Sequence, residues 1–257
     1  MRIVRTRAEL RDALEPSRDG STIGLVPTMG AYHDGHLALF RAACGDCDAV
    51  VASLFVNPAQ FPERSDLVRY PRDEERDARL AEEAGVDVLF VPADDEIYPA
   101  GFETWVDVTG LGARLEGEHR PGHFRGVATV CLKLFNLVQP RLAYFGQKDA
   151  QQVAVLRRMI RDLDLELSLR VVPTVRDADG LALSSRNALL SPAERERALA
   201  LPRALATRDP DAARAALDGL DVDYVEVVEL DPPVLAAAVR VGSTRLIDNV
   251  VLKEEPR

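Results

Sequence analysis

The sequence has no apolar run as long as the roughly 18–20 residues that a membrane-spanning helix needs. Its first residues, Met1–Arg5, also lack the apolar stretch and the small-residue cleavage site of a secretory signal. There are only 3 cysteines, and an odd number in a chain without a signal argues against a disulfide framework. We therefore expect a cytoplasmic protein with no membrane partner.

An excess of positive charge is also lacking. Lys and Arg total 32 against 42 acidic residues, which gives a net charge of −10 at pH 7. Such a surface repels a polynucleotide unless basic residues are concentrated locally. Basic residues do recur around Arg114–Arg125 and Arg157–Arg161, but acidic residues lie among or beside them. We expect no nucleic-acid partner, and a small anionic ligand suits this chain better.

Strand patterns alternate with helical patterns over most of the chain. Apolar residues recur at helical spacing between the strand patterns, for example at Leu37, Phe40 and Cys44. This alternation predicts an α/β fold with a mostly parallel sheet covered by helices. The strand candidates are Ile23–Pro27, Ala49–Val56, Val86–Val91, Leu142–Phe145 and Leu165–Val172.

The pattern changes after residue 174. Ser191 and Pro192 open a charged helix, with the serine as its cap and the proline at its first position. Two strand patterns follow, at Tyr224–Leu230 and Leu246–Leu252. We predict a larger domain of residues 1–174 and a smaller α+β domain of residues 175–257.

The most informative motif is Val26–His36, where the first strand pattern runs into a helix. In an open parallel sheet, ligands bind at the carboxyl ends of the strands, and helix N-termini there offer N–H groups to phosphate. Gly30 and Gly35 allow the backbone to approach a ligand closely. His33 and His36 can stabilise the charge that grows as pyrophosphate leaves. The motif predicts a phosphate site.

Two cysteines, Cys44 and Cys47, follow these histidines, and all four side chains are of types that bind zinc. A helix between His36 and Cys44 would separate them by about 12 Å along its axis, whereas zinc needs its ligands within about 2.0–2.3 Å. A redox pair is also disfavoured, because a helix end lacks the N-terminal dipole that lowers a thiol pKa. We expect Cys44 to pack in the core.

Three further motifs follow in order along the chain. Gln60 comes after a strand pattern and offers an amide that both donates and accepts. Lys148 would lie near a helix N-terminus, where the helix dipole does not favour a cation, which indicates an anionic partner; the Walker A pattern is absent. Ser184, Ser185 and Arg186 form a compact phosphate-binding group. Taken singly, each motif is more often an ordinary surface feature.

Together the four motifs resemble the pantothenate synthetase family of nucleotidylyltransferases, which carries a His-x-x-His signature. The similarity runs from Val26 to Asn187 and resumes at Val241–Asn249. It implies a Rossmann-like N-terminal domain, a small C-terminal domain closing over the active site, and a homodimer. It also implies an ATP- and Mg²⁺-dependent condensation of (R)-pantoate with β-alanine through a pantoyl adenylate, which yields pantothenate, AMP and pyrophosphate.

The resemblance also implies roles for single residues. His36 would be the principal catalytic residue, together with His33, Lys148, Ser184, Ser185 and Arg186. Gln60 and Gln152 would hold pantoate, Gln60 would lie close to β-alanine, and Asp77 would help to bind Mg²⁺. Arg120 and His123 look like part of a mobile lid. The ATP contacts would be Met29, Gly30, Ala31, Tyr32, His33, Asp34, Gly35, His36, Gly146, Gln147, Lys148, Asp149, Val175, Leu183, Ser184, Ser185 and Arg186.

The sequence departs from the family pattern at a few positions. Tyr32, Asp34 and Gln147 replace the commoner Leu, Glu and Glu, and the region 201–224 is shorter than usual. The alternative is a related adenylate-forming ligase or nucleotidylyltransferase that acts on another small acid. A tRNA-charging enzyme would need a basic RNA-binding region. A non-catalytic nucleotide sensor is a further alternative, and the presence of His36, Lys148 and Arg186 argues against it.

Overall fold

The computed structural model describes residues 1–62 and 64–252, and the chain forms two compact units. The first comprises Met1–Phe145 and Val155–Val172, and the second comprises Gly146–Ala154 and Pro173–Arg257. The division at Pro173 lies close to the expected boundary at residue 174, but no sequence pattern indicated that Gly146–Ala154 groups with the second unit. Among the described residues, no helix is long and apolar enough to cross a bilayer.

A six-stranded sheet in the order β1-β4-β3-β2-β5-β6 forms the centre of the first unit, and the strand pairs described in it are parallel. The predicted α/β fold is confirmed. From β2 the chain proceeds through β3 to β4 on one side, and β5 then pairs with β2 on its other side. The strand order therefore reverses beside β2, the place where open α/β sheets bind ligands. The strands are β1 (Arg2–Val4), β2 (Ile23–Thr28), β3 (Ala49–Leu54), β4 (Val88–Phe90), β5 (Leu142–Gly146) and β6 (Ser168–Val172).

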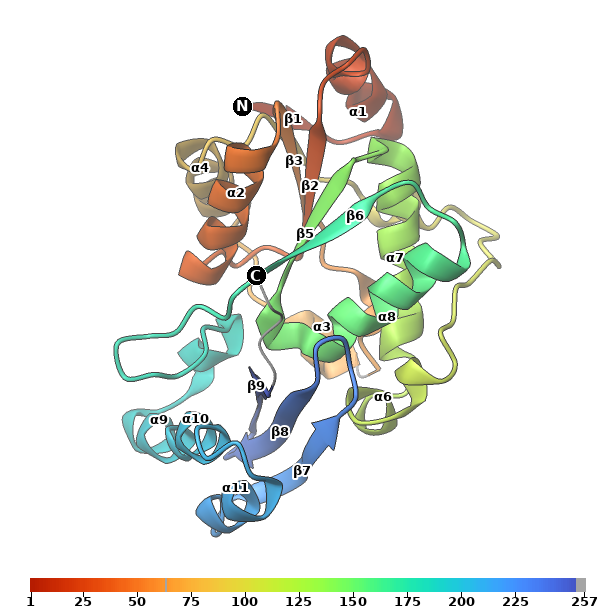
Figure 1. Cartoon of the computed structure of the whole chain (residues 1–257). Helices are drawn as coiled ribbons and strands as arrows, with labels where there is room; N and C mark the ends of the chain where they lie inside the picture. Colours follow the sequence, from red (N-terminus) through yellow and green to blue (C-terminus); the bar gives the residue numbers. More distant parts are fainter. Residues whose placement is uncertain (63, 253–257) are drawn as a thin grey trace. The chain divides into compact units, whose positions relative to one another are not determined.

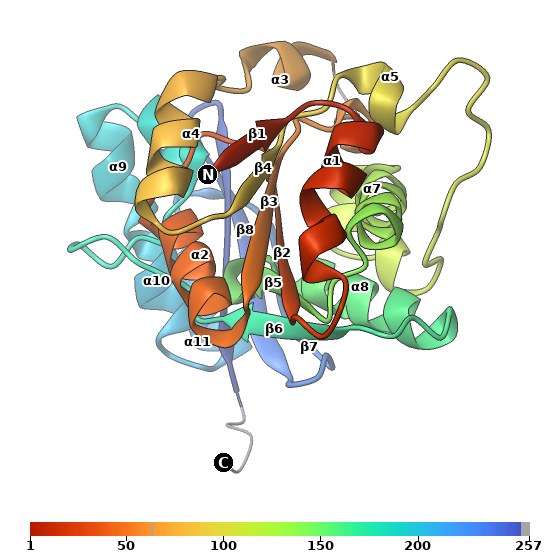
Figure 2. The ribbon, with the colours of Figure 1, turned by 90° about the horizontal axis from the view of Figure 1, so that it is seen from above.

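Helices cover both faces of this sheet. Figure 2 shows α2 and α4 on one face and α1 and α7 on the other. The apolar face of α7 contributes to the core, because Val127, Leu134 and Val138 are buried. The helices of this part of the chain are α1 (Arg7–Leu14), α2 (Asp34–Asp46), α3 (Arg64–Arg69), α4 (Glu74–Glu83), α5 (Asp94–Ile97), α6 (Glu116–His119), α7 (His123–Val138) and α8 (Ala150–Asp162).

Cys44, which was expected in the core, packs against it but is only half-buried. Leu39, Phe40 and Ala43 form the buried face of α2, and Cys44 is one residue, or about 100°, beyond Ala43 around the helix. Its half-buried Sγ donates to the carbonyl of Gly85 at 3.3 Å. Burial raises the pKa of the Cys44 thiol, which makes it a poor nucleophile.

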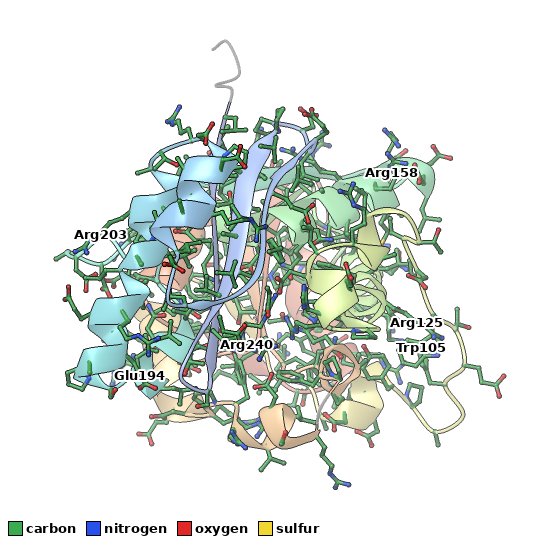
Figure 3. The ribbon with its side chains drawn as sticks, turned by 90° about the horizontal axis from the view of Figure 1, so that it is seen from below. Trp105, Arg125, Arg158, Glu194, Arg203 and Arg240 are labelled. Carbon is green, nitrogen blue, oxygen red and sulfur yellow. The ribbon has the colours of Figure 1, made fainter. Side chains whose placement is uncertain are left out.

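An extended segment between α5 and α6 packs its aromatic rings against α7. Arg125 lies over the Trp105 ring, 4.9 Å from its centroid (Figure 3), and Lys133 lies over Phe102 at 4.8 Å. Tyr98 contacts both rings, at 5.1 Å from Phe102 and 5.9 Å from Trp105. The segment thus holds Tyr98 in place, and its hydroxyl reaches the candidate site.

The second unit contains an antiparallel sheet, β7-β8-β9, with α9 (Pro192–Ala198), α10 (Ala200–Leu205) and α11 (Pro210–Ala216) packed on it (Figure 1). The expected α+β character and the Ser191 cap are confirmed. The strands are β7 (Asp221–Val228), β8 (Val234–Val241) and β9 (Thr244–Val251). The sequence did not predict β8, because its Ala-rich centre has low strand propensity and burial on both faces removes the alternation.

Candidate active site

The histidine motif forms a tight turn between β2 and α2, as predicted. Two consecutive residues in this turn are left-handed: Gly30 has φ of +85° and Ala31 has φ of +53°. A Cβ atom at Gly30 would lie 2.8 Å from Oδ2 of Asp77, so the position requires glycine. The turn leads directly into α2, and His33 is the N-cap of that helix.

The hydrogen bonds of the two histidine rings define which nitrogen carries the proton. Nδ1 of His33 accepts from the Gly35 N–H at 3.1 Å, and Nδ1 of His36 accepts from the His33 N–H at 3.2 Å. A neutral ring that accepts at Nδ1 carries its hydrogen on Nε2. The two rings lie 4.2 Å apart, so they offer a pair of N–H donors of the kind that suits phosphoryl oxygens.

Asp77 approaches the same turn from the first turn of α4. Its side chain is 1% exposed, and its two oxygens accept the N–H groups of Ala31 at 2.6 Å and Tyr32 at 2.9 Å. Arg76 lies 3.4 Å from Oδ1. Among the residues that the structure describes, no group of three or more His, Cys, Asp or Glu side chains could hold a metal ion. The role in Mg²⁺ binding expected for Asp77 does not fit a carboxylate that is already bonded to the backbone.

Burial raises the pKa of Asp77, although the N–H groups of Tyr32 and Ala31 and the charge of Arg76 act in the opposite direction. A raised pKa in the folded state favours the protonated acid there. The contribution of Asp77 to stability is therefore present below the pKa of an unfolded aspartate and is lost as the pH rises through its raised value.

Gln60 lies in the short 3₁₀ helix η2 (Pro58–Gln60) after β3 and is buried. Its Oε1 accepts from Nδ2 of Asn57 at 3.0 Å, and its Nε2 donates to the sulfur of Met29 at 3.1 Å. The fold thus brings two predicted site residues, Met29 and Gln60, into contact. Sequence reasoning assigned no role to Asn57, which also accepts from the Tyr98 hydroxyl at 2.8 Å. Its only signal was its place at a strand end before proline.

Arg120 and His123, the residues expected in a lid, both contact the backbone of Gln60. Nδ1 of His123 lies 2.9 Å from the Gln60 carbonyl oxygen, and Arg120 reaches the same oxygen at 3.4 Å. A carbonyl only accepts, so Nδ1 of His123 donates, and its Nε2 then accepts from Arg120 at 3.2 Å. In this conformation the two side chains hold η2 in place, and their role in a lid stays a prediction.

In the second unit, Lys148 lies in the 3₁₀ turn η4 (Gln147–Asp149) before α8, as the strand-to-helix pattern predicted. The buried side chain of Asn249, from β9, holds this turn. Its Nδ2 donates to the carbonyls of Gln147 and Lys148, both at 2.9 Å, and its Oδ1 accepts from Nε2 of Gln147 at 3.0 Å. Gln152 lies on the first turn of α8. The sequence pointed to the motif that contains Asn249 but not to this contact.

The serine–arginine motif begins the 3₁₀ helix η5 (Ser185–Leu189). Oγ of Ser184 caps it by accepting from the Arg186 N–H at 3.3 Å. The Leu183 N–H donates to the carbonyl of Val175 at 3.0 Å, so these two predicted ATP contacts are neighbours. Within each unit, the predicted residues are therefore grouped around one or two short turns.

Known proteins resemble this chain over nearly its whole length. A family model for pantoate-beta-alanine ligase matches residues 2–251. The pantothenate synthetase of Acidobacterium capsulatum is 49% identical over 294 aligned residues, which cover 100% of this chain and 98% of the relative. The pantothenate synthetase of Heliobacterium modesticaldum is 51% identical over 280 residues, which cover 98% and 100%.

Solved structures agree with these matches. The pantothenate synthetase of Thermus thermophilus superposes with a TM-score of 0.93 at 47% identity, covering 99% of this chain and 100% of that one. The pantoate-beta-alanine ligase of Francisella tularensis, complexed with beta-gamma ATP and β-alanine, superposes with a TM-score of 0.89 at 32% identity and covers 100% of both chains.

Proposed function

The chain belongs to the pantoate–β-alanine ligase family, and we propose that its two histidines and the turns around them carry out the family's reaction. The enzyme condenses (R)-pantoate with β-alanine to pantothenate and cleaves ATP to AMP and pyrophosphate. A carboxylate is a poor electrophile, so pantoate is first joined to AMP as a mixed anhydride. The amine of β-alanine then attacks the pantoyl carbonyl, and AMP leaves.

The observation that carries this proposal is the pair of histidines at the start of α2, beside the strand at which the sheet order reverses. Nε2 of His33 and His36 would donate to the phosphate oxygens as the pantoate carboxylate attacks the α-phosphorus. Donors aimed at charge that grows in the transition state accelerate the reaction more than they tighten ATP binding. In the second unit, Lys148, Ser184, Ser185 and Arg186 would bind phosphate as the family resemblance implies.

The contacts of Asp77 refine the expected ATP contacts. The N–H groups of Ala31 and Tyr32 already donate to Asp77, so any contact of these two residues with ATP would use other atoms. Mg²⁺ commonly keeps several waters and takes substrate phosphates as ligands. We propose that Mg²⁺ would bind together with ATP, through the phosphates and water, and not at a preformed protein site.

A substrate assay tests the function directly. ATP consumption should require pantoate, and pantothenate should form only when β-alanine is added. AMP release is followed with the two natural substrates and then with D-lactate in place of pantoate or glycine in place of β-alanine. Equal turnover with the unrelated acid would favour the alternative, a related ligase for another small acid.

Replacing Gln60 with alanine should raise the KM for pantoate about ten- to a hundredfold, because losing a hydrogen bond to a charged ligand costs roughly 1.5–3 kcal/mol. We expect the same direction for Gln152→Ala. The KM for ATP, measured in the same titrations, serves as the control and should stay close to that of the wild type. If both variants kept the wild-type KM for pantoate, the acid would have to bind elsewhere.

We also propose, from the family resemblance, that the protein is a cytoplasmic homodimer. Light scattering should then give about twice the chain mass of 28.2 kDa. A mass equal to that of one chain would overturn this proposal without affecting the assignment of the reaction.

A further inference from the structure

The carboxylate of Asp77 binds the histidine turn in the way that a free anion would. Successive backbone N–H groups in a turn can form a concave anion site, often called a nest. Here Gly30 and Ala31 are the left-handed residues, and the N–H groups of Ala31 and Tyr32 converge on the two oxygens of Asp77. The protein's own side chain therefore fills the nest.

The turn needs such a partner, because alanine rarely adopts a left-handed conformation and keeps it only where its surroundings impose it. The neighbouring Arg76 strengthens the attachment, since its Nη2 donates to the carbonyl of Tyr32 at 3.1 Å. Asp73 caps the N-terminus of α4 by accepting from the N–H of Arg76 at 3.0 Å. Tyr32 is thus bound through both its N–H and its carbonyl to one end of α4.

This attachment acts on the histidines through the next residues of the chain. His33 follows Tyr32 directly and caps α2, and its own N–H donates to the ring of His36. The Tyr32 ring is buried and lies 5.3 Å from the ring of His36. A shift of Tyr32 therefore moves both imidazole rings.

We infer that Asp77 is a positioning residue, which holds the turn Gly30–Tyr32 and thereby sets the positions of His33 and His36, and that it does not ligate Mg²⁺. The consequence for catalysis rests on the proposed function of these histidines. The two hydrogen bonds from Ala31 and Tyr32 to Asp77, called the clamp below, do not depend on that function, because they can be measured in the protein without any ligand.

The first test measures the clamp by hydrogen exchange in the ligand-free protein. Asp77→Asn keeps one oxygen but places an NH₂ group opposite the second N–H, so one hydrogen bond is lost. The amides of Ala31 and Tyr32 should exchange about 5- to 30-fold faster than in the wild type. Glu75→Gln, an exposed carboxylate-to-amide change on the same turn of α4, should leave their exchange unchanged. Unchanged protection of these amides in Asp77→Asn would overturn the inference.

The second test separates positioning from metal binding. A displacement of about 1 Å can cost on the order of 10²-fold in rate, so Asp77→Asn should lower kcat for pantoate-dependent exchange of pyrophosphate into ATP by up to that factor. The Mg²⁺ concentration that gives half-maximal activity should equal that of the wild type. Asp77→Glu retains a charge but shifts the oxygens, so it should also lower kcat with the same Mg²⁺ dependence.

The outcomes discriminate between the two roles. A shifted Mg²⁺ dependence, or rescue of Asp77→Asn by excess Mg²⁺, would make Asp77 a metal ligand and overturn the inference. A wild-type protein that showed no exchange of pyrophosphate would refute the proposed function instead, whereas the amide measurement would still decide whether Asp77 holds the turn.

Discussion

Replacing His36 with alanine should reduce pantoate-dependent exchange of labelled pyrophosphate into ATP by about 10²–10³-fold, the loss typical of one preorganised stabiliser of developing charge. The affinity for ATP should fall much less, because the Nε2–H donor acts mainly on charge that appears in the transition state. Lys148→Ala should behave in the same way. The assay omits β-alanine, so it reports only the adenylation step.

His119→Ala is the matched control for His36→Ala. His119 is exposed on α6 and has no proposed part in adenylation, so its loss should leave the exchange rate within about twofold of the wild type. Normal exchange by His36→Ala or Lys148→Ala, with failure to form pantothenate, would place that residue in the attack by the amine. Our assignment to the first step would then be wrong.

Replacing Gly126 with alanine should weaken pantoate binding, although Gly126 is not itself a proposed pantoate contact. An added Cβ would lie 2.4 Å from the carbonyl oxygen of Ala59 and 2.7 Å from the nitrogen of Gln60. These are backbone atoms, so α7 and η2 must separate, and the bond from Asn57 to the Gly126 carbonyl at 3.1 Å would be strained. We expect the free energy of unfolding to fall by roughly 1–3 kcal/mol and kcat/KM for pantoate by about 10²-fold.

Gly45→Ala provides the comparison for this prediction. Gly45 also lies in a helix, but a Cβ there would meet no atom within 4 Å. Alanine should be neutral at this position or stabilise by about 0.5–1 kcal/mol, with unchanged kinetics. Chemical denaturation and pantoate titrations of both variants test the pair. Equal behaviour of the two would show that the contact between α7 and η2 is not close enough to limit the residue at position 126.

The parts of the fold that could be predicted are those that local pattern encodes. Long apolar runs bounded by polar residues revealed β2 and β3, and the serine–proline pair revealed the start of α9. The missed strands are β1, with three residues, and β8, in which buried alanines erase the alternation of a half-exposed strand. Their identity as strands comes from pairing with distant neighbours, which a local pattern does not contain.

The candidate site likewise contains features that the local sequence predicts and features that depend on contacts between distant segments. Glycine and histidine at a strand-to-helix junction predicted the turn between β2 and α2, since such a turn depends on a few consecutive residues; phosphate binding there stays a prediction. Asn57 and Asn249 were missed, because each acts through contacts with other segments. The resemblance singled out Asp77 but assigned it a metal-binding role, and only the structure shows the bonds to Ala31 and Tyr32, which lie 46 and 45 positions away.

The turn that carries Lys148 is held by three hydrogen bonds of Asn249, a residue that is synthesised much later than the turn itself. Asn249 follows Lys148 by 101 positions. At a synthesis rate of about 5–20 residues per second, roughly 5–20 s pass between the addition of the two residues. During that interval the carbonyls of Gln147 and Lys148 have no Asn249 to bind, even if α8 has already formed. The growing chain therefore contains all residues of the histidine turn early, whereas the hydrogen bonds that hold the lysine turn form only after β9 has been made.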